Sequence, residues 1–278
     1  MSSRPRLKLI VSPRATGCTP ARIERLTAAL AASHAVTVYE LRGPGDYRNA
    51  VAPGDELVAV AGGDGTVREV ATMLAGTDRR LAVIPAGTTN VIAIALGLRD
   101  DADAVARIRA GHARDWRMFR ANGEPFMFCA GAGIDAETCR CINPALKARV
   151  RKLSYVAALL GVIARYDYPR FAADALPGRE LTQAILLGCG YYAGARRLAC
   201  SDPADAQLEL LALSPTRLTT LAVLAALTMR GMRNPVTAVG SCSLTADAGA
   251  RVPYQLDGDF AGYLPLQVEP AAVIRLIG

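Results

Sequence analysis

The stretch Ala61-Gly-Gly-Asp-Gly-Thr-Val-Arg-Glu-Val70 is the most informative part of this 278-residue chain. It follows the strand-like run 56–61 and leads into a segment whose apolar side chains recur at helical spacing. Glycines in a strand-to-helix turn let the backbone approach a ligand closely, and the N–H groups that open the helix favour phosphate. Because Asp64 would repel phosphate without a cation or hydroxyl beside it, the turn indicates phosphate with a metal, or phosphoryl transfer. The alternative is a tight turn with Asp64 as a helix N-cap.

The same alternation of strand and helix patterns fills the first 110 or so residues. Apolar runs at 7–11, 36–39 and 81–84 predict strands, and Thr19-Pro20 has the residue types of a helix N-cap followed by the first helical position. Such alternation is typical of a parallel, doubly wound sheet. Ligands of these sheets bind at the carboxyl ends of the strands. We therefore expect the loops 12–17, 62–66 and 87–90 to gather at that edge.

Beyond Trp116 the pattern changes to strands with few helices between them. The expected strands are 125–130, 183–190, 208–213, 241–245 and 266–269, and one long helix is expected over 144–166. This pattern predicts two domains. Residues 1–120 would form an α/β domain with a parallel sheet, and residues 121–278 a mainly antiparallel β domain.

The bulk composition limits the partners. A net charge of +7 favours an anionic partner, but aromatic residues make up only 5% and no nucleic-acid motif is present, so we expect no nucleic acid. Seven cysteines without metal-ligand spacing predict reduced thiols of a cytoplasmic protein. Two histidines in unrelated contexts argue against zinc and against histidine catalysis. No apolar run is long enough to span a bilayer, so membrane contact would be peripheral.

Four motifs in sequence order carry a resemblance to a known family: Gly62-Gly-Asp-Gly-Thr66, Pro85-Ala-Gly-Thr-Thr-Asn90, Gly131-Ala-Gly-Ile-Asp135 and Asp257-Gly-Asp259. The chain resembles the diacylglycerol kinase catalytic-domain family of lipid kinases. The resemblance implies that residues 1–120 form a nucleotide-binding domain like those of phosphofructokinases and NAD kinases. It implies that residues 121–278 form a β-sandwich domain for the lipid substrate. It also implies transfer of the γ-phosphoryl group of ATP to a lipid hydroxyl, with Mg²⁺ as cofactor.

The resemblance also assigns roles to residues. The residues expected to hold ATP are Ser12, Gly62, Gly63, Asp64, Gly65, Thr66, Gly87 and Thr88. Asp259 is expected to take the proton of the lipid hydroxyl, with Asp64 and Asp257 as further catalytic carboxylates; whether Asp259 or Asp64 is the base is left open. Asp135 is expected to contact the substrate headgroup. A structural Mg²⁺ would be held by the Asp205 carboxylate and the backbone carbonyls of Asp202 and Gln207.

The substrate and the partners have alternatives. Diacylglycerol is the leading substrate, with ceramide or a sphingoid base as the rival, and a soluble acceptor, as in NAD kinases, is a second enzyme hypothesis. Departures from the family pattern at Leu41, Arg68, Ala206 and Asp259 motivate a third, a nucleotide- and lipid-binding regulator with weakened catalysis.

The basic cluster Lys147, Arg149, Arg151 and Lys152 would face anionic lipid headgroups, or would simply be a solvated helix face. The apolar segment 218–232 suits a lipid-facing lid. The oligomeric state, including a homodimer, stays open.

Overall fold

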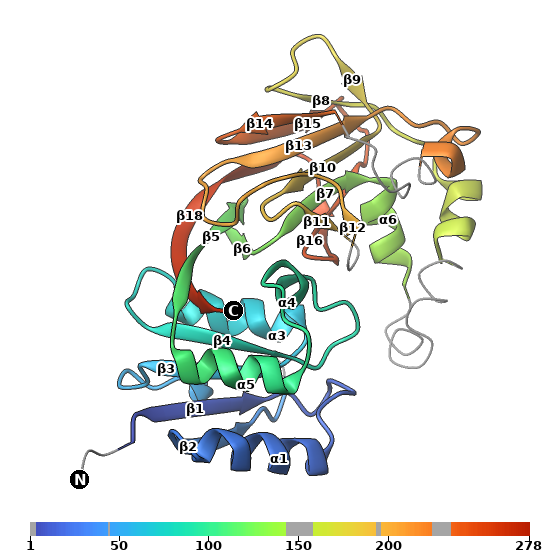
Figure 1. Cartoon of the computed structure of the whole chain (residues 1–278). Helices are drawn as coiled ribbons and strands as arrows, with labels where there is room; N and C mark the ends of the chain where they lie inside the picture. The colour runs from blue at the N-terminus through green and yellow to red at the C-terminus, as the bar shows by residue number, and fades with distance from the viewer. Residues whose placement is uncertain (1–3, 44, 143–157, 193–195, 224–234) are drawn as a thin grey trace. The chain divides into compact units, whose positions relative to one another are not determined.

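The computed structural model describes residues 4–43, 45–142, 158–192, 196–223 and 235–278. The chain forms two compact units (Figure 1). Unit 1 comprises residues 1–118 and 272–278, and unit 2 comprises residues 119–271. The chain therefore passes between the units twice, within β5 (Ala113–Ala121) and within β18 (Leu266–Ile277).

Unit 1 is built on a parallel sheet in the order β2-β1-β3-β4-β18. Its strands, apart from the last residues of β18, are β1 (Arg6–Val11), β2 (Ala35–Glu40), β3 (Leu57–Gly62) and β4 (Arg80–Pro85). All four pairings are parallel, and residues 275–277 of β18 complete the sheet beside residues 80–82 of β4. Every residue of β3 is buried, as expected for a central strand covered on both faces.

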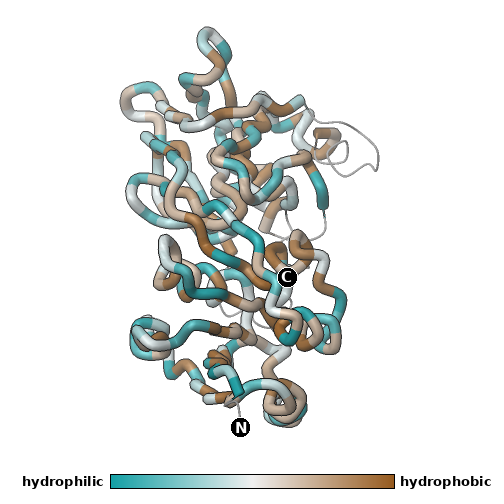
Figure 2. The backbone as a smooth tube through the Cα atoms, turned by 60° about the vertical axis from the view of Figure 1, so that its left-hand side comes forward, coloured by the Kyte–Doolittle hydropathy of each residue, from teal (hydrophilic) through white to brown (hydrophobic). Residues whose placement is uncertain are grey.

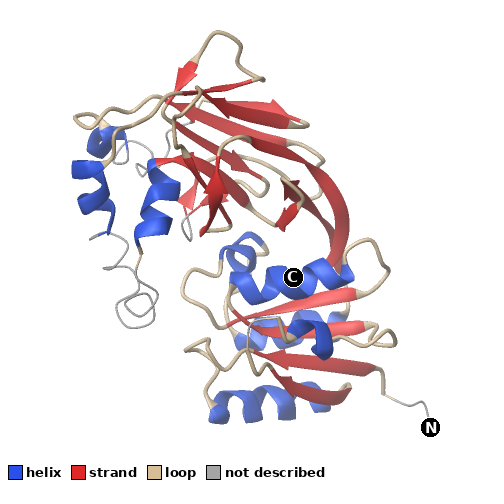
Figure 3. Cartoon of the chain, turned by 180° about the vertical axis from the view of Figure 1, so that it is seen from behind, coloured by secondary structure: helices blue, strands red, loops and turns tan. Residues whose placement is uncertain are grey.

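The helices of unit 1 cover both faces of this sheet (Figure 3). They are α1 (Pro20–Ala31), α2 (Tyr47–Ala50), α3 (Asp64–Leu74), α4 (Val91–Ala95) and α5 (Asp101–Ala110). One face packs Leu7, Leu9 and Ala59 against Leu26 of α1 and Ile108 of α5. Residues of opposite parity in the strands face the other side, where α3 packs on β3. The predicted doubly wound α/β architecture is confirmed.

The expected helix start at Thr19-Pro20 is confirmed. Thr19 has an extended backbone, its hydroxyl accepts the N–H of Arg22 at 3.4 Å, and Pro20 is the first helical residue. The helix α5 is capped in the same way by Asp100, whose carboxylate accepts the N–H of Asp103 at 2.8 Å. It ends at Gly111, which has φ 69°.

Unit 2 is a sandwich of two mainly antiparallel sheets. The first sheet, in the order β14-β13-β10-β7-β16-β17, is made of Val236–Val239, Leu208–Leu213, Gln183–Leu187, Cys129–Gly133, Pro253–Leu256 and Asp259–Tyr263. The second contains the first residues of β18, β15 (Cys242–Ala246), β8 (Phe171–Ala173) and β9 (Glu180–Leu181), with β5 and β6 (Glu124–Phe126) alongside. One core joins them, including Phe126 and Leu244 on one side and Leu186 and Leu210 on the other. The predicted β-sandwich is confirmed.

Two helices and a short ribbon complete unit 2. The helix α6 (Ile134–Cys141) follows β7, a helix over 158–165 packs beside it, and β11 (Tyr191–Tyr192) pairs with β12 (Arg196–Arg197). Of the long helix expected over 144–166, residues 144–157 lie outside the described part of the chain. Hydrophilic residues recur along the outer loops of both units (Figure 2). Within the described residues, no helix has both the length and the apolar character needed to cross a membrane.

Candidate functional site

Three loops of unit 1 meet at the carboxyl edge of the parallel sheet. The N–H of Ser12 donates to Ala61 O at 2.9 Å, that of Gly17 to Ala86 O at 3.1 Å, and that of Ala86 to Gly62 O at 2.9 Å. The structure therefore brings together residues 12–17, 62–66 and 87–90, as expected. We call these three segments the loop cluster.

The glycines of the loop cluster differ in why the structure has no side chain at their positions. A Cβ on Gly87 would lie 2.6 Å from the Cα of Gly63, so the contact between the two loops itself requires glycine at 87. A Cβ on Gly65, in the first turn of α3, would meet nothing within 4 Å. No packing contact therefore explains the absence of a side chain at Gly65, which leaves open space beside the start of this helix. The N-cap of α3 is Gly63, which has no side chain that could accept hydrogen bonds from the first-turn amides.

Asp64 joins two loops of the cluster. Its carboxylate accepts the N–H of Ile92 at 3.1 Å and the hydroxyl of Thr89 at 3.0 Å. It thus caps α4, the helix 28 residues further along the chain, while being itself the first residue of α3. Burial raises the pKa of Asp64, and the hydrogen bonds from the start of α4 oppose that rise. A carboxylate at this helix N-terminus is favourable because it satisfies amides that have no partner within the helix.

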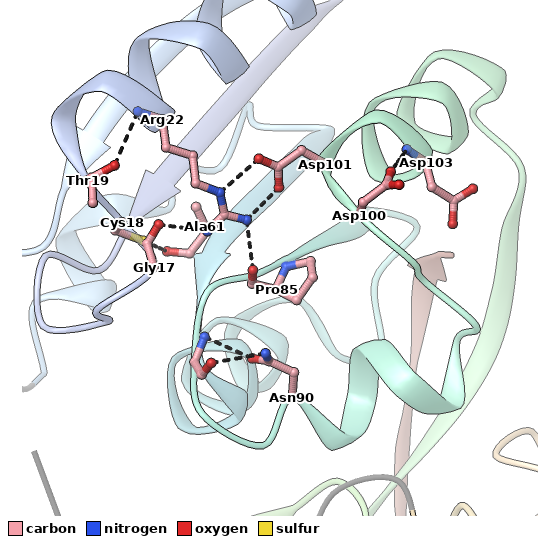
Figure 4. A network of polar contacts seen from close by, with 11 residues as sticks. Gly17, Cys18, Thr19, Arg22, Ala61, Pro85, Asn90, Asp100, Asp101 and Asp103 are labelled. Atoms are coloured by element: carbon pink, nitrogen blue, oxygen red, sulfur yellow. Dashed lines mark hydrogen bonds and ion pairs between the residues drawn. The ribbon is translucent and has the colours of Figure 1, made fainter. Parts of the chain in front are cut away.

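Asn90 closes the third loop on itself. Its side-chain carbonyl accepts the N–H of Gly87 at 2.8 Å, and its amide donates to Gly87 O at 3.1 Å (Figure 4). Its φ of 49° lies in the left-handed region, which asparagine tolerates better than most residues. The intervening Thr88 is exposed. The loop is therefore fixed by its own side chains and presents Thr88 at the surface.

Arg22 fixes the first loop, and sequence reasoning did not find it. Its guanidinium donates to Gly17 O at 2.7 Å, to Pro85 O at 2.8 Å and to the carboxylate of Asp101, at 2.8 Å from Nε (Figure 4). The hydrogen bond from Arg22 lowers the pKa of Asp101. The only local signal is a basic residue in the first turn of α1; the acidic partner lies 79 residues away.

The turn Asp257–Asp259 of unit 2, the acidic turn, contains two predicted catalytic acids with different surroundings. The carboxylate of Asp257 accepts the N–H groups of Met127, Phe128 and Cys129 at 2.8, 2.9 and 3.0 Å. Asp257 has φ 51°. Asp259, two residues on, begins β17 and is exposed. Asp257 thus holds the acidic turn against the start of β7, and Asp259 lies at the surface.

Asp135 is tied to the acidic turn through a glutamine. It is 6% exposed, and its carboxylate accepts the amide of Gln255 at 3.0 Å and the hydroxyl of Tyr192. The carbonyl of Gln255 in turn accepts the N–H of Gly258 at 2.7 Å. Sequence reasoning missed Gln255. The signal for it is a polar residue inside a strand of otherwise apolar positions, where it is 1% exposed.

The expected Mg²⁺ residues lie on one exposed turn before β13. The N–H of Asp205 donates to Asp202 O at 2.9 Å, and the Asp202 carboxylate accepts the N–H of Ala204 at 2.9 Å. Oxygen donors of this kind suit Mg²⁺, although the turn already uses the Asp202 carbonyl. Within the ranges that the structure describes, no three side chains of His, Cys, Asp or Glu are placed to share an ion. The metal assignment therefore stays a prediction.

Two predicted surface features fall outside the described residues. The basic cluster 147–152 does so entirely, and the proposed lid is described only up to residue 223. The seven cysteines are described, and none forms a disulfide.

Comparisons with known proteins agree with this architecture. Residues 6–121 match the family model for the diacylglycerol kinase catalytic domain. A diacylglycerol kinase of Bacillus subtilis is 27% identical over 227 residues, 76% of this chain and 73% of that protein. A Pseudomonas aeruginosa protein named "Probable lipid kinase YegS-like" is 30% identical over 158 residues, about half of each chain (54% and 51%).

Solved structures share the fold. A diacylglycerol kinase structure from Bacillus anthracis superimposes with a TM-score of 0.76 at 20% identity, covering 100% of this chain and 98% of the other. An Archaeoglobus fulgidus NAD kinase in complex with ATP has a TM-score of 0.55 at 11% identity, covering 98% and 93%. The fold is thus that of diacylglycerol and NAD kinases, and residues 6–121 are similar to the diacylglycerol kinase catalytic domain.

Proposed function

We propose that this protein is a lipid kinase that transfers the γ-phosphoryl group of ATP to a lipid hydroxyl at a membrane surface, with diacylglycerol as the acceptor. The match of residues 6–121 to the family model and the similarity to a diacylglycerol kinase of Bacillus subtilis support the kinase class. The observation that carries the proposal furthest is the open space at Gly65, beside the uncapped start of α3 and amid three loops at the carboxyl edge of a parallel sheet. Helix N-termini in this position bind phosphate groups.

The residues have separate tasks in this proposal. The backbone of 62–66, with Ser12 and Thr88, would hold the ATP phosphates. Asp64, Asp257 and Asn90 would keep the loops and the acidic turn in shape, which phosphoryl transfer requires because it depends mainly on positioning. Asp259 would accept the proton of the lipid hydroxyl, and Asp135 would contact the headgroup. Bound Mg²⁺ would neutralise phosphate charge, with Asp205, Asp202 and Gln207 as the candidate residues for a structural ion.

The proposal is tested by γ-phosphoryl transfer from labelled ATP, with Mg²⁺, to mixed micelles that each contain one lipid. The acceptors are diacylglycerol, ceramide, sphingosine and phosphatidylglycerol, with NAD as a soluble acceptor. We expect labelled phosphatidate from diacylglycerol. A labelled ceramide or sphingosine product would keep the kinase and change the acceptor, and labelled NADP would replace the lipid assignment. ATP binding without any product would favour the regulator.

The nucleotide site has its own test in Gly65→Ala. The added methyl group meets no protein atom within 4 Å, so the fold should tolerate it. If ATP phosphates approach the start of α3, the methyl group should weaken ATP binding at least tenfold, as measured by calorimetry. Unchanged ATP affinity in a normally folded Gly65→Ala protein would remove this segment from the nucleotide site.

A further inference from the structure

A cavity of about 940 Å³ lies within unit 2, and its lining includes no residue of the acidic turn or of the loop cluster. Its walls come from the last turn of α6, the helix 158–165 with the residues after it, the turn before β16 and the end of β17. The two helices lie side by side (Figures 1 and 3) and share an apolar contact that includes Ile134 and Val162. The cavity is thus supported by packed elements on several sides.

Arginines give this cavity its chemistry. Arg140, Arg165 and Arg251 line it together with two acids, Glu137 and Asp167. Glu137 is already paired, since both its oxygens accept from the Arg140 guanidinium, at 2.6 and 2.8 Å. Among the described residues, neither Arg165 nor Arg251 has an acidic partner within ion-pair distance. The wall thus has two guanidinium groups with unused donors against one carboxylate, which favours an anion.

A buried hydroxyl without a partner supplies a second, independent observation. Tyr166 lines the cavity and is 9% exposed, yet its hydroxyl has no hydrogen-bond partner among the described residues. Such a group costs free energy unless a ligand or water satisfies it. Burial, assisted by the Glu137 carboxylate, raises the pKa of Tyr166, so the phenol stays protonated and can donate. An acceptor oxygen in the cavity would satisfy it.

The other walls of the cavity indicate which chemical groups a ligand would have besides an anionic one. Arg251 lies over the ring of Tyr263, 4.3 Å from the ring centroid, which holds the guanidinium beside an aromatic surface. Ala158, Gly161 and Val162 add small and apolar walls. A volume of about 940 Å³ far exceeds that of phosphate alone and falls in the range that holds organic ligands.

We propose that this cavity is a second ligand site, which binds the phosphate group of an organic phosphate through Arg165, Arg251 and the Tyr166 hydroxyl. The apolar walls receive the organic part of the same ligand. This site does not depend on the proposed kinase activity, because none of its residues belongs to the loop cluster or the acidic turn.

The test is calorimetric titration of the full-length protein with four probes: inorganic phosphate, glycerol 3-phosphate, short-chain phosphatidate below its micelle concentration, and short-chain phosphatidylcholine. We expect phosphatidate to bind, and phosphatidylcholine, which carries no net charge, to bind at least tenfold more weakly. Binding of glycerol 3-phosphate as tight as that of phosphatidate would support the site with a soluble phosphate as its ligand. Equal binding of phosphatidylcholine, or no binding of any phosphate, would overturn the proposal.

Variants attribute the binding to this cavity. Arg165→Gln and Arg251→Gln should each weaken phosphatidate binding about tenfold, because each removes a charge-assisted hydrogen bond. Arg120→Gln, an exposed arginine of unit 2 outside the cavity, is the matched control and should change nothing. Tyr166→Phe should weaken binding several-fold without lowering the unfolding midpoint, since it removes an unpartnered hydroxyl and keeps the ring. If both arginine variants bind phosphatidate as tightly as the parent protein does, phosphatidate binds outside this cavity and the proposal is overturned.

Discussion

The loop cluster of unit 1 and the acidic turn of unit 2 use an aspartate in the same way. Asp64 accepts hydrogen bonds from Thr89 and Ile92, and Asp257 accepts three from 127–129. A residue close to each aspartate has room around it. Asp259, two residues after Asp257, is exposed, and Gly65, directly after Asp64, has open space where a side chain would stand. An acid of a motif can therefore hold the backbone while its neighbour presents the surface that we propose for phosphoryl transfer.

The largest effect is expected from Asp257→Ala. Three backbone amides lose their acceptor, and alanine is strained at φ 51°, so the free energy of unfolding should fall by about 3 kcal/mol. Urea unfolding followed by circular dichroism measures it. Asp257→Asn keeps one acceptor oxygen and tolerates the left-handed backbone, so it should lose clearly less. A loss below about 0.5 kcal/mol in Asp257→Ala would mean that the carboxylate does not hold the acidic turn.

A smaller loss is expected from Gly87→Ala, which breaks the contact between two loops of the cluster. The new Cβ would lie 2.6 Å from the Cα of Gly63, so backbone must move, at a cost of about 2 kcal/mol. Gly65→Ala is the matched control within the same cluster. It should be neutral or stabilising by about 0.5 kcal/mol, because alanine favours the helix. If urea unfolds the two variants with equal free energies of unfolding, Gly87 is not needed for the contact between the loops.

Removing the cap of α4 in Asp64→Ala should cost about 1 kcal/mol in the free energy of unfolding. Thr72→Ala, an exposed substitution in the same helix α3, serves as control and should stay within about 0.5 kcal/mol of the parent protein. Hydrogen exchange at Ile92 should accelerate in Asp64→Ala only. Unchanged exchange there would show that the capping bond contributes nothing.

The pH dependence of Asp64 gives the smallest and most specific effect. Its pKa is raised in the folded state, so between the ordinary value of 3.8 and the raised value the folded protein binds the proton more tightly than the unfolded chain does. Asp64 therefore contributes stability below pH 3.8 that is lost as pH rises through the raised pKa. The stability of Asp64→Asn relative to the parent should rise with pH across this window in paired urea titrations. A fall would reverse the sign of the shift.

Local patterns predicted much of the fold. Apolar runs and cap residues such as Thr19 are short-range signals, so they predicted the parallel sheet, the antiparallel strands of unit 2 and the gathering of the three loops. The sandwich arrangement was predicted from the family resemblance. Partners distant in sequence could not be predicted: Asp64 caps a helix 28 residues away, and Arg22 binds Asp101, 79 residues away. Nor did any local signal show that β18 would return residues 272–278 to unit 1, since its composition suits either sheet.

The motifs predicted which segments of the candidate site lie together, but not what each side chain contacts. Gly62–Thr66 and Gly87–Asn90 lie together as expected. The motifs did not reveal that Gly87 is needed for the close contact between two loops, whereas Gly65 is not. Gln255 was missed because a single buried glutamine in a strand has no motif of its own. Its importance appears only when Asp135 and Gly258 lie on either side of it.

The role of Asp259 is best measured by single-turnover γ-phosphoryl transfer to the lipid acceptor by Asp259→Asn, with ATP binding and folding measured on the same sample. Because Asp259 is assigned the proton of the lipid hydroxyl and is exposed, the transfer rate should fall by about 100-fold or more, with ATP affinity unchanged and the protein still folded. Glu269→Gln, another exposed acid of unit 2, should leave the rate unchanged. An active Asp259→Asn beside an inactive, folded and ATP-binding Asp64→Asn would contradict the account and make Asp64 the base.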